Sequence, residues 1–385
     1  MEPKPSALAI DLMLQFADLT GLRGAGKPPR RYLWTDAFAV CNFLELFRLT
    51  QEKRYRDLAL RLVEQVHQTL GRHREDDPRS GWISGLDEEE GKQHPTLGGL
   101  RIGKKLPELQ PDEPVDERLE WDRDGQYYHY LTKWMHALNR VSRVTGDPAC
   151  HRWGAELAKT AHSRFLYGPP GQQRMYWKMS IDLSRPLVPA MGQHDPLDGL
   201  VTCSELQAAD GERTASPALD LGTTITDLAL LCRGQNLVTD DPLGIGGLLF
   251  DASRMSQLRA GGHLAEVDLL APVLEAAERG LEAFSVRSPL RLQPIYRLPF
   301  RELGLAIGLR AFGKMRPVIE SNPDRFDPSL RKRTESLRRY EKFREPIENF
   351  WSEGENQKSE RWLEHREINM VMLATSLESE GFLAI

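Results

Sequence analysis

One sequence pattern recurs six times along this chain. In each copy a segment rich in Asp, His, Glu or Trp leads into an apolar helix, and in most copies a turn and a more charged helix follow. The copies begin at Trp34, Asp124, His194, Asp240, Pro299 and Trp362. A helix that is apolar on all sides is buried, whereas a helix with one apolar stripe lies at the surface. The pattern therefore predicts six helical hairpins, each with an inner and an outer helix, that close into a ring.

The predicted hairpins account for most of the chain. Inner helices are expected at residues 34–50, 126–144, 197–208, 244–259, 301–314 and 363–377. Outer helices are expected at residues 53–70, 148–165, 219–232, 264–284 and 330–351. The helix expected at 6–19 has no inner partner of its own, so we expect it to pair with the last inner helix. The fold class is then all-α, an (α/α)6 toroid formed by residues 1–385 as a single domain.

Two connections are too long to be turns. Residues 72–123 are rich in glycine, proline and acidic residues, and residues 167–193 contain an alternating aromatic and aliphatic stretch that predicts short strands. Long loops inside a compact domain are usually functional or disordered. Their aromatic and glycine content favours order, so both are predicted to be lid-like insertions that carry small β-hairpins over the cavity.

Composition narrows the possible partners and compartments. The chain is 40% hydrophobic and 28% charged, and its net charge of −5 is spread along the sequence, which favours neither a nucleic-acid nor a membrane partner. The four cysteines are far apart and form no CxxC motif, which indicates buried thiols in a reducing compartment. The apolar N-terminal stretch is broken by polar residues, unlike a signal peptide, and no apolar run is long enough to span a bilayer. We expect a cytoplasmic protein.

Polar residues gather where the inner helices begin. In a toroid of hairpins all inner helices run in the same direction, so these ends surround one mouth of the cavity. Asp124 and His129 lie there among the aromatic residues Trp121 and Tyr128. Carboxylates beside aromatic faces suit a sugar, whose C–H faces pack on rings while its hydroxyls form hydrogen bonds. The alternative is that the acid caps a helix and the rings fill the core.

A second constellation contains His194, Asp195 and Asp198. Asp195 precedes a proline and fits a helix N-cap, whereas Asp198 lies one turn later and needs another explanation. The spacing matches neither HxH nor HExxH, so no metal is predicted. With no P-loop and no GxGxxG after a strand, no cofactor is predicted. Arg101, in the glycine-rich segment 98–104, is either a lid residue facing an anionic substrate or part of a solvated loop.

Two segments resemble the repeated hairpins of the six-hairpin glycosidase superfamily, which includes unsaturated glucuronyl hydrolases and N-acylglucosamine 2-epimerases. They are YLWTDAFAVCNFLELFRLTQEKRYRDLAL and RVTGDPACHRWGAELA. The resemblance implies an (α/α)6 toroid with a sugar site at the mouth of the pore. WTDAF is similar to the inner helix of the glucuronyl hydrolases that begins with Trp and Asp, which implies that Asp36 lies near the substrate. Paired histidines like those of the epimerases are not evident.

The leading hypothesis is a glycoside hydrolase acting on a small saccharide. Hydrolysis needs a carboxylic acid and a second carboxylate, and we assign the acid to Asp124 and its partner to Asp198 or Asp36. The alternatives are a sugar epimerase or isomerase with His129 or His365 as the base, a lyase or dehydratase on a non-sugar substrate, and a non-catalytic binding toroid. The predicted substrate-binding residues are Trp34, Trp121, Tyr128, His194, Asp195, Glu302, Glu364, His365 and Arg101.

Overall fold

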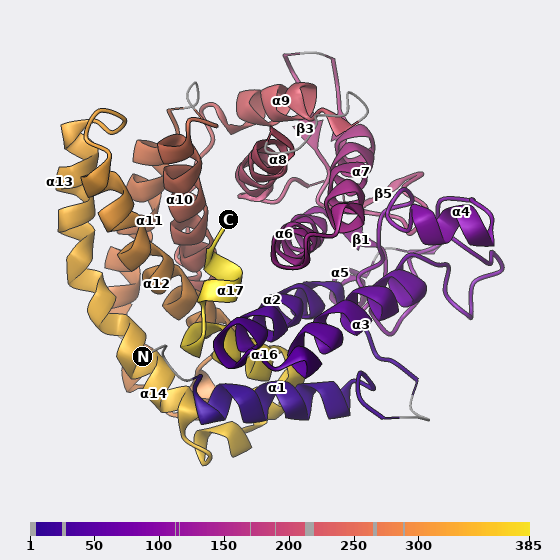
Figure 1. Cartoon of the computed structure of the whole chain (residues 1–385), viewed down its shortest axis with the longest axis horizontal. Coiled ribbons are helices and arrows are strands. Elements are labelled where there is room, and N and C mark those ends of the chain that lie inside the picture. The colour runs from indigo at the N-terminus through magenta and orange to yellow at the C-terminus, as the bar shows by residue number, and fades with distance from the viewer. Residues whose placement is uncertain are drawn as a thin grey trace. The chain divides into compact units, whose positions relative to one another are not determined.

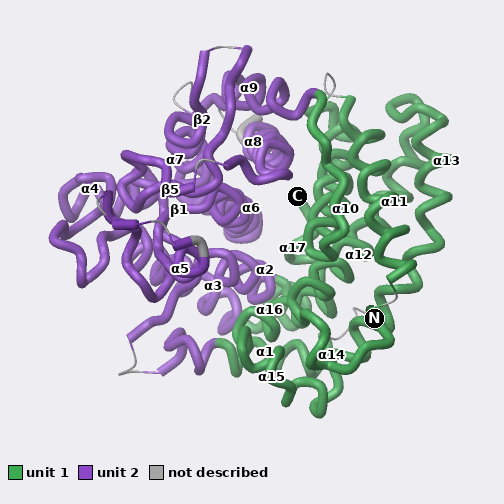
Figure 2. Tube along the Cα trace, turned by 180° about the vertical axis from the view of Figure 1, so that it is seen from behind, with its two compact units in different colours: residues 1–16, 45–52, 234–385 green, residues 17–44, 53–233 purple. Residues whose placement is uncertain are grey.

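The computed structural model describes residues 5–24, 28–111, 113–114, 116–169, 171–188, 190–211, 219–264, 268–287 and 289–385. Figure 1 shows its helices and strands, and Figure 2 shows the two compact units into which its contacts divide the chain. Unit 1 comprises Met1–Phe16, Glu45–Glu52 and Gly234–Ile385, and unit 2 comprises Ala17–Leu44 and Lys53–Arg233. No helix among the described residues is both long and apolar enough to cross a membrane. All four cysteines are buried, and none of them forms a disulfide bond.

Unit 2 contains the first three predicted hairpins. Its main helices are the first part of α2 (Leu33–Thr50), α3 (Lys53–Leu70), α6 (Tyr128–Thr145), α7 (Pro148–Phe165), α8 (Asp195–Gly211) and α9 (Gly222–Cys232). The turn between α6 and α7 shows why the chain reverses where it does. Gly146 ends α6 in the left-handed conformation, with φ of 78°, and the Asp147 carboxylate caps α7 by accepting from the Ala149 N–H. Both features are local, so the sequence alone specified this connection.

The insertions of unit 2 carry short helices and strands. These are α4 (Glu88–Gln93), α5 (Glu117–Glu120), β1 (Gln126–Tyr127), β2 (Leu166–Tyr167), β3 (Arg174–Met175), β4 (Lys178–Met179) and β5 (Pro186–Val188). Strand β4 pairs antiparallel with both β1 and β5, and β2 pairs antiparallel with β3. The strands expected within residues 167–193 are therefore confirmed.

The two long insertions are also bonded to each other. The Arg79 guanidinium lies 2.7 Å from a carboxylate oxygen of Asp182 and 2.9 Å from one of Glu108. The second oxygen of Glu108 accepts from the Ile181 N–H at 2.5 Å. Each insertion thus supplies charged or backbone partners for the other, which ties residues 72–123 to residues 167–193.

Unit 1 contains the later hairpins. Its helices include α10 (Pro242–Gly261), α11 (Leu270–Arg287), α12 (Pro299–Ser321), α13 (Pro328–Leu337), α14 (Arg344–Ser352), α15 (Glu360–Glu364), α16 (Arg366–Leu377) and α17 (Glu380–Leu383). Short 3-10 turns occupy Pro289–Arg291, Pro294–Tyr296 and Asn356–Lys358. The single outer helix predicted at 330–351 is divided by a 3-10 segment, Arg338–Phe343. Pro346, at the start of α14, lacks the N–H that an uninterrupted helix would bond to the carbonyl of Lys342.

Glycines allow α10 and α12 to pack closely. A Cβ added to Gly246 would overlap the carbonyl oxygen of Gly304, and a Cβ added to Gly308 would overlap the backbone of Gly246. The two backbones are therefore in direct contact, which accounts for the small residues of these two apolar helices.

The two ends of the chain meet within unit 1. The Ser6 N–H, which immediately precedes α1 (Ala7–Leu19), donates to Glu378 Oε1 at 2.6 Å. A second bond joins the Arg366 guanidinium at the start of α16 to Gln15 of α1, at 3.5 Å. The predicted pairing of the first and last helices is confirmed by these contacts.

Candidate functional site

A cluster of polar residues lies in unit 2 where α6 packs against α8. Asp195 and Asp198 occupy the first turn of α8, and both are buried. One oxygen of Asp198 accepts from the Thr132 hydroxyl at 2.5 Å and from the Lys133 ammonium at 2.6 Å. Thr132 and Lys133 both belong to the second turn of α6. Asp198 is thus an ion-paired carboxylate held by the neighbouring helix.

Asp195 has different surroundings. Its Oδ2 atom is buried and has no hydrogen-bond partner among the described residues, and Oδ1 lies 3.7 Å from the Nδ1 atom of His129. The pKa of Asp195 is raised to about 8, chiefly by burial and also by the negative charge of Asp198, while Lys133 partly opposes the rise. Asp195 is therefore a protonated carboxylic acid at neutral pH.

Glycine sets the position of this acid. A Cβ added to Gly192 would overlap the carboxyl group of Asp195, so a larger residue there would displace the acid. The Oδ2 atom of Asp195 accepts no backbone N–H, so this atom does not cap helix α8.

His129 is the third member of the cluster. Its side chain is 31% exposed, and its Nδ1 atom has no hydrogen-bond partner among the described residues. Desolvation, assisted by the positive charge of Lys133, lowers the pKa of His129 to about 4. A neutral imidazole thus lies beside a protonated acid, and together they offer one proton donor and one proton acceptor.

Aromatic rings extend from this cluster toward solvent. The Tyr127 ring lies 5.4 Å from the ring of His129 and 4.9 Å from that of Trp177, measured between centroids. Trp177 in turn lies 5.3 Å from Trp121, which is 57% exposed. Tyr32 and Tyr130 form a second aromatic pair, and their hydroxyl oxygens share a hydrogen bond of 2.5 Å.

Three of the predicted substrate-binding residues, Trp34, Tyr128 and His194, are buried or half-buried. Trp34 is largely buried, with its ring 4.7 Å from that of Phe38. Tyr128 is also buried, and its hydroxyl packs against Gly199. His194 is half-buried immediately before Asp195.

Asp36 is buried at the start of α2. It accepts from the Tyr32 N–H at 2.9 Å and lies 3.5 Å from the guanidinium of Arg31. Burial raises the pKa of Asp36 to about 6, although Arg31 opposes the rise. These contacts fix the beginning of the helix, so we infer a structural role for Asp36 in place of the predicted catalytic one.

Asp124, the predicted general acid, is fully enclosed. Its side chain has no exposed surface, and its oxygens lie 2.5 Å from Arg101 and 3.2 Å from Arg74. Three backbone N–H groups also donate to it. Arg101 is similarly occupied, since it donates to two backbone carbonyls as well. We infer that both residues hold the insertion 72–123 in place.

The candidates of unit 1 form no comparable cluster with one another. Glu302 is buried and accepts from the Arg297 guanidinium through both oxygens, at 2.6 and 3.0 Å, and from Trp351 Nε1 at 2.9 Å. His365 is half-buried, and its ring lies 5.4 Å from that of Phe300, between centroids. Glu302 thus has its full set of partners inside the fold.

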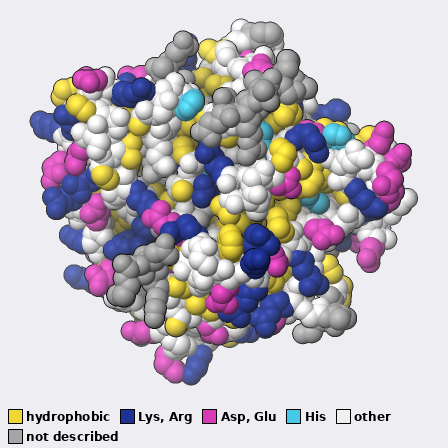
Figure 3. Space-filling model, in the orientation of Figure 1, with side chains coloured by type: hydrophobic (Ala, Val, Ile, Leu, Met, Phe, Trp, Pro, Cys, Tyr) yellow, Lys and Arg dark blue, Asp and Glu magenta, His cyan; other side chains and the backbone are white. Residues whose placement is uncertain are grey.

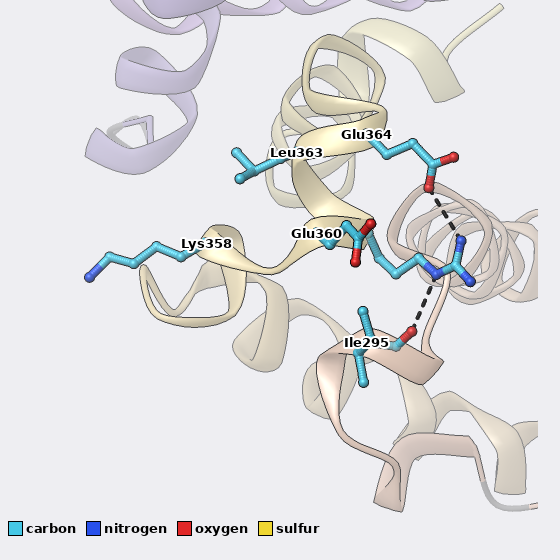
Figure 4. Close-up of a pocket in the computed structure, with 6 residues that line it drawn as sticks. Ile295, Lys358, Glu360, Leu363 and Glu364 are labelled. Carbon is cyan, nitrogen blue, oxygen red and sulfur yellow. Dashed lines mark hydrogen bonds and ion pairs between the residues drawn. The ribbon is translucent and has the colours of Figure 1, made fainter.

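Glu364 lies at a surface pocket of unit 1 with a volume of about 650 Å³ (Figure 4). The pocket is lined by Ile295, Lys358, Glu360, Arg361, Leu363 and Glu364. Within it, Arg361 bridges the Glu364 carboxylate and the Ile295 carbonyl, both at 3.2 Å. The charged side chains of this lining are exposed to solvent, and none of the six residues is a buried proton donor like Asp195.

Replacing Glu302 with Gln is expected to lower the free energy of unfolding by about 3 kcal/mol, because it leaves the Arg297 charge buried without a counter-ion. Glu364→Gln is the matched control, since that carboxylate is half exposed, and its change should stay within about 0.5 kcal/mol. Chemical denaturation of both variants measures the difference. Equal effects would contradict the structural role of Glu302.

Sequence reasoning did not identify Lys133, Thr132 or Trp177 as site residues. Lys133 lies four residues after His129, a spacing that places both on one face of α6. Asp195 and Asp198 share a face of α8 in the same way. Both spacings can be read from the sequence, whereas the contact between these faces of α6 and α8 cannot.

Positive and negative side chains are interspersed on the face shown in Figure 3, and neither sign forms a continuous patch there. The part of the chain that the structure describes contains no group of three or more His, Cys, Asp or Glu side chains placed to hold a metal ion. The polar cluster in unit 2 contains the carboxyl groups of Asp195 and Asp198, the imidazole of His129 and the ammonium group of Lys133.

No protein family model and no curated protein sequence matches this chain. Solved structures do match it. A GH76 alpha-mannanase of Bacteroides thetaiotaomicron is 12% identical with a TM-score of 0.53, over 97% of this chain and 95% of that one. The chain has the fold of the six-hairpin glycosidases.

Two further structures support the same fold. An alpha-1,6-mannanase of a Salegentibacter species, in complex with alpha-1,6-mannotetrose, is 11% identical with a TM-score of 0.53 over 98% of both chains. An unsaturated glucuronyl hydrolase specific for heparin is 14% identical with a TM-score of 0.50, over 97% of this chain and 95% of that one. The predicted all-α (α/α)6 fold class is thereby confirmed.

Proposed function

We propose that this chain is a carbohydrate-active enzyme that hydrolyses a glycosidic bond, with Asp195 as the general acid and Asp198 as the second carboxylate. The observation that carries the proposal is the contrast between the two groups. Asp195 is a buried acid whose raised pKa keeps its proton at neutral pH, and Asp198, one turn later, is paired with Lys133. Glycoside hydrolysis requires one protonated carboxylic acid and one ionised carboxylate, held apart in protonation by their different surroundings.

Each group has a defined step. Asp195 donates its proton to the glycosidic oxygen as the bond to the anomeric carbon breaks. Asp198 stabilises the positive charge that develops on the sugar ring and accepts the proton of the attacking water. Lys133 and Thr132 hold Asp198 in place through its Oδ2 atom. The products are two sugars with free hydroxyl groups.

The fold is consistent with this chemistry, but the carboxylates are spaced differently from those of one similar protein. The Salegentibacter mannanase is inactive when two consecutive aspartates are replaced. In this chain consecutive aspartates occur at Asp76–Asp77 and Asp240–Asp241, whereas Asp195 and Asp198 are separated by two residues. The proposal therefore depends on the geometry of Asp195 and Asp198 and takes only the substrate class, a saccharide, from the fold.

The insertions are proposed to border the substrate. Trp177, from the insertion 167–193, lies against Tyr127 and faces the ring of His129, with an angle of 8° between the two ring planes. The contacts of Arg79 attach this segment to the insertion 72–123. We therefore propose that the two segments act together as a wall of the site.

The activity should fall as the pH rises through about 8, the pKa of Asp195. Above that value kcat/KM is expected to decrease about tenfold per pH unit, because the acid has lost the proton it must donate. The measurement is a pH profile of kcat/KM on a hydrolysed glycoside. A profile that stays flat to pH 9.5, roughly a unit and a half above that pKa, would contradict the assignment.

A second function, sugar epimerisation or isomerisation, is favoured by one observation. His129 is neutral and its Nδ1 atom has no hydrogen-bond partner among the described residues, so it can accept a proton from a sugar carbon. Incorporation of solvent deuterium into a C–H bond of the product would identify this reaction. Hydrolysis instead incorporates solvent oxygen and creates a new reducing end.

The test begins with a panel of glycosides and free sugars, screened by thermal shift and by product analysis. A saccharide that binds raises Tm by mass action. Hydrolysis of a glycoside by the wild-type chain supports the proposal. A saccharide that stabilises the protein but is never converted would instead indicate the non-catalytic binding toroid.

A further inference from the structure

An exposed tryptophan stands at the outer end of the aromatic rings. Trp121 is 57% exposed, and its ring meets that of Trp177 at 69° with centroids 5.3 Å apart. Trp177 is half-buried on the insertion 167–193, directly before β4. The two indoles together form what we term the tryptophan shelf.

A buried lysine holds the shelf together. Lys178 of β4 has no exposed surface, and its ammonium lies 2.6 Å from the Glu120 carboxylate and 2.9 Å from the carbonyl oxygens of Glu120 and Arg123. Those residues flank Trp121 on both sides. Burying an ammonium group is costly unless it is fully paired, as it is here. Lys178 thus fixes Trp121 beside Trp177 although most of the Trp121 ring stays in contact with solvent.

The shelf is continuous with the proposed acid. The Tyr127 ring packs against both Trp177 and His129, with centroid distances of 4.9 and 5.4 Å, and the rings of Trp177 and His129 lie 6.4 Å apart between centroids. Lys178 Nζ lies 5.2 Å from the centre of the Tyr127 ring. His129 Nδ1 is 3.7 Å from Asp195. A row of rings therefore leads from solvent to the proton donor, and it is formed entirely within unit 2.

We propose that the tryptophan shelf binds the apolar face of a sugar residue beyond the one at the reacting bond. The substrate would then be an oligosaccharide or polysaccharide, because a monosaccharide glycoside placed at Asp195 would leave the shelf unused. An exposed indole held rigidly by a buried ion pair binds ligands without a further loss of side-chain freedom. This inference rests on the proposed function, since Asp195 defines where the reacting bond lies.

The experiment compares Trp121→Ala with Leu119→Ala. Leu119 is a suitable control because it is an exposed apolar side chain of α5, two residues away, and it does not belong to the shelf. Binding is measured by calorimetry in the Asp195→Asn background, so that no ligand is consumed. The probes are monosaccharides and tetrasaccharides of the manno, gluco and glucurono series. Trp121→Ala should weaken tetrasaccharide binding about tenfold more than monosaccharide binding, and Trp121→Phe should restore part of the loss.

The outcomes separate the shelf from the acid. Equal tetrasaccharide affinities for Trp121→Ala and Leu119→Ala would overturn the shelf, as would a wild-type chain that binds none of the tetrasaccharides more tightly than the monosaccharides. If Trp121→Ala weakens tetrasaccharide binding while Asp195→Asn leaves turnover unchanged, the shelf stands and the assignment of the acid fails. If Asp195→Asn abolishes turnover and Trp121→Ala has no effect on binding, the reverse holds.

Discussion

Replacing Asp195 with Asn should lower kcat/KM by about a thousandfold and at the same time make the fold more stable at pH 7. The loss follows because Asn cannot donate a proton to a glycosidic oxygen, and general acid catalysis contributes factors of this size. The gain follows because the wild-type fold keeps on Asp195 a proton that the unfolded chain releases at pH 7, and Asn does not ionise in either state. A residue that is costly for stability and needed for activity is the expected combination at a catalytic site.

The sign of the stability change depends on pH. The pKa of Asp195 is about 8 in the fold, against 3.8 for an ordinary aspartate. Below about pH 4 Asp195 is protonated in both the folded and the unfolded state, so its raised pKa causes no loss of stability there. As the pH rises toward 8 the unfolded state releases the proton and the folded state retains it, and stability is lost. Asp195→Asn removes this loss, which amounts to about 2 to 4 kcal/mol at pH 7.

The measurements are Tm at pH 3.5 and pH 7 and kcat/KM at pH 7. Asp147→Asn is the matched control, because Asp147 also begins a helix, lies outside the site and can be replaced as a cap by Asn. The assignment fails if Asp195→Asn retains wild-type turnover. A gain in Tm that is the same at both pH values would contradict the buried-acid explanation.

Replacing Asp124 with Asn should lower the free energy of unfolding by about 3 kcal/mol. The substitution removes the negative charge that faces Arg101 and Arg74 in a fully buried position. The folded fraction should keep most of its turnover, because Asp124 has no exposed surface through which to reach a substrate. Urea denaturation and kcat/KM per folded molecule provide the two measurements.

Asp122→Asn is the control for this substitution. Asp122 lies two residues away and is exposed, so its replacement should change stability by no more than about 0.5 kcal/mol. A large loss of turnover in Asp124→Asn with an unchanged unfolding free energy would restore Asp124 as the general acid.

The helices were predictable because their signals are local. Apolar residues at three- and four-residue spacings in 53–70 mark a surface helix, and the Gly146 and Asp147 pair marks a turn, whatever the rest of the chain does. The division of the predicted helix 330–351 was missed, although Pro346 was a visible signal for it. The pairing of the chain ends followed from counting inner helices against outer ones.

The site was predictable only in part. His194, Asp195 and Asp198 stood out as one constellation, and His129 as part of another, but their common location depends on α6 packing against α8. The shelf was harder to foresee, because Trp177 and Trp121 belong to different insertions that are joined by the buried Lys178. Contacts between segments more than fifty residues apart leave no periodic signal in the sequence.

Asp124 and Asp195 show where the sequence stops being informative. The sequence by itself determined the all-α repeat, the helix starts and the group of polar residues from which a site could be drawn. Both aspartates precede or open an apolar helix, and nothing local distinguishes them. The tertiary structure gives Asp124 two arginines and three backbone donors, and it gives Asp195 a neutral histidine and a negative neighbour. Protonation is set by burial and by charges brought from other segments, so only the folded chain decides which carboxyl group can act as an acid.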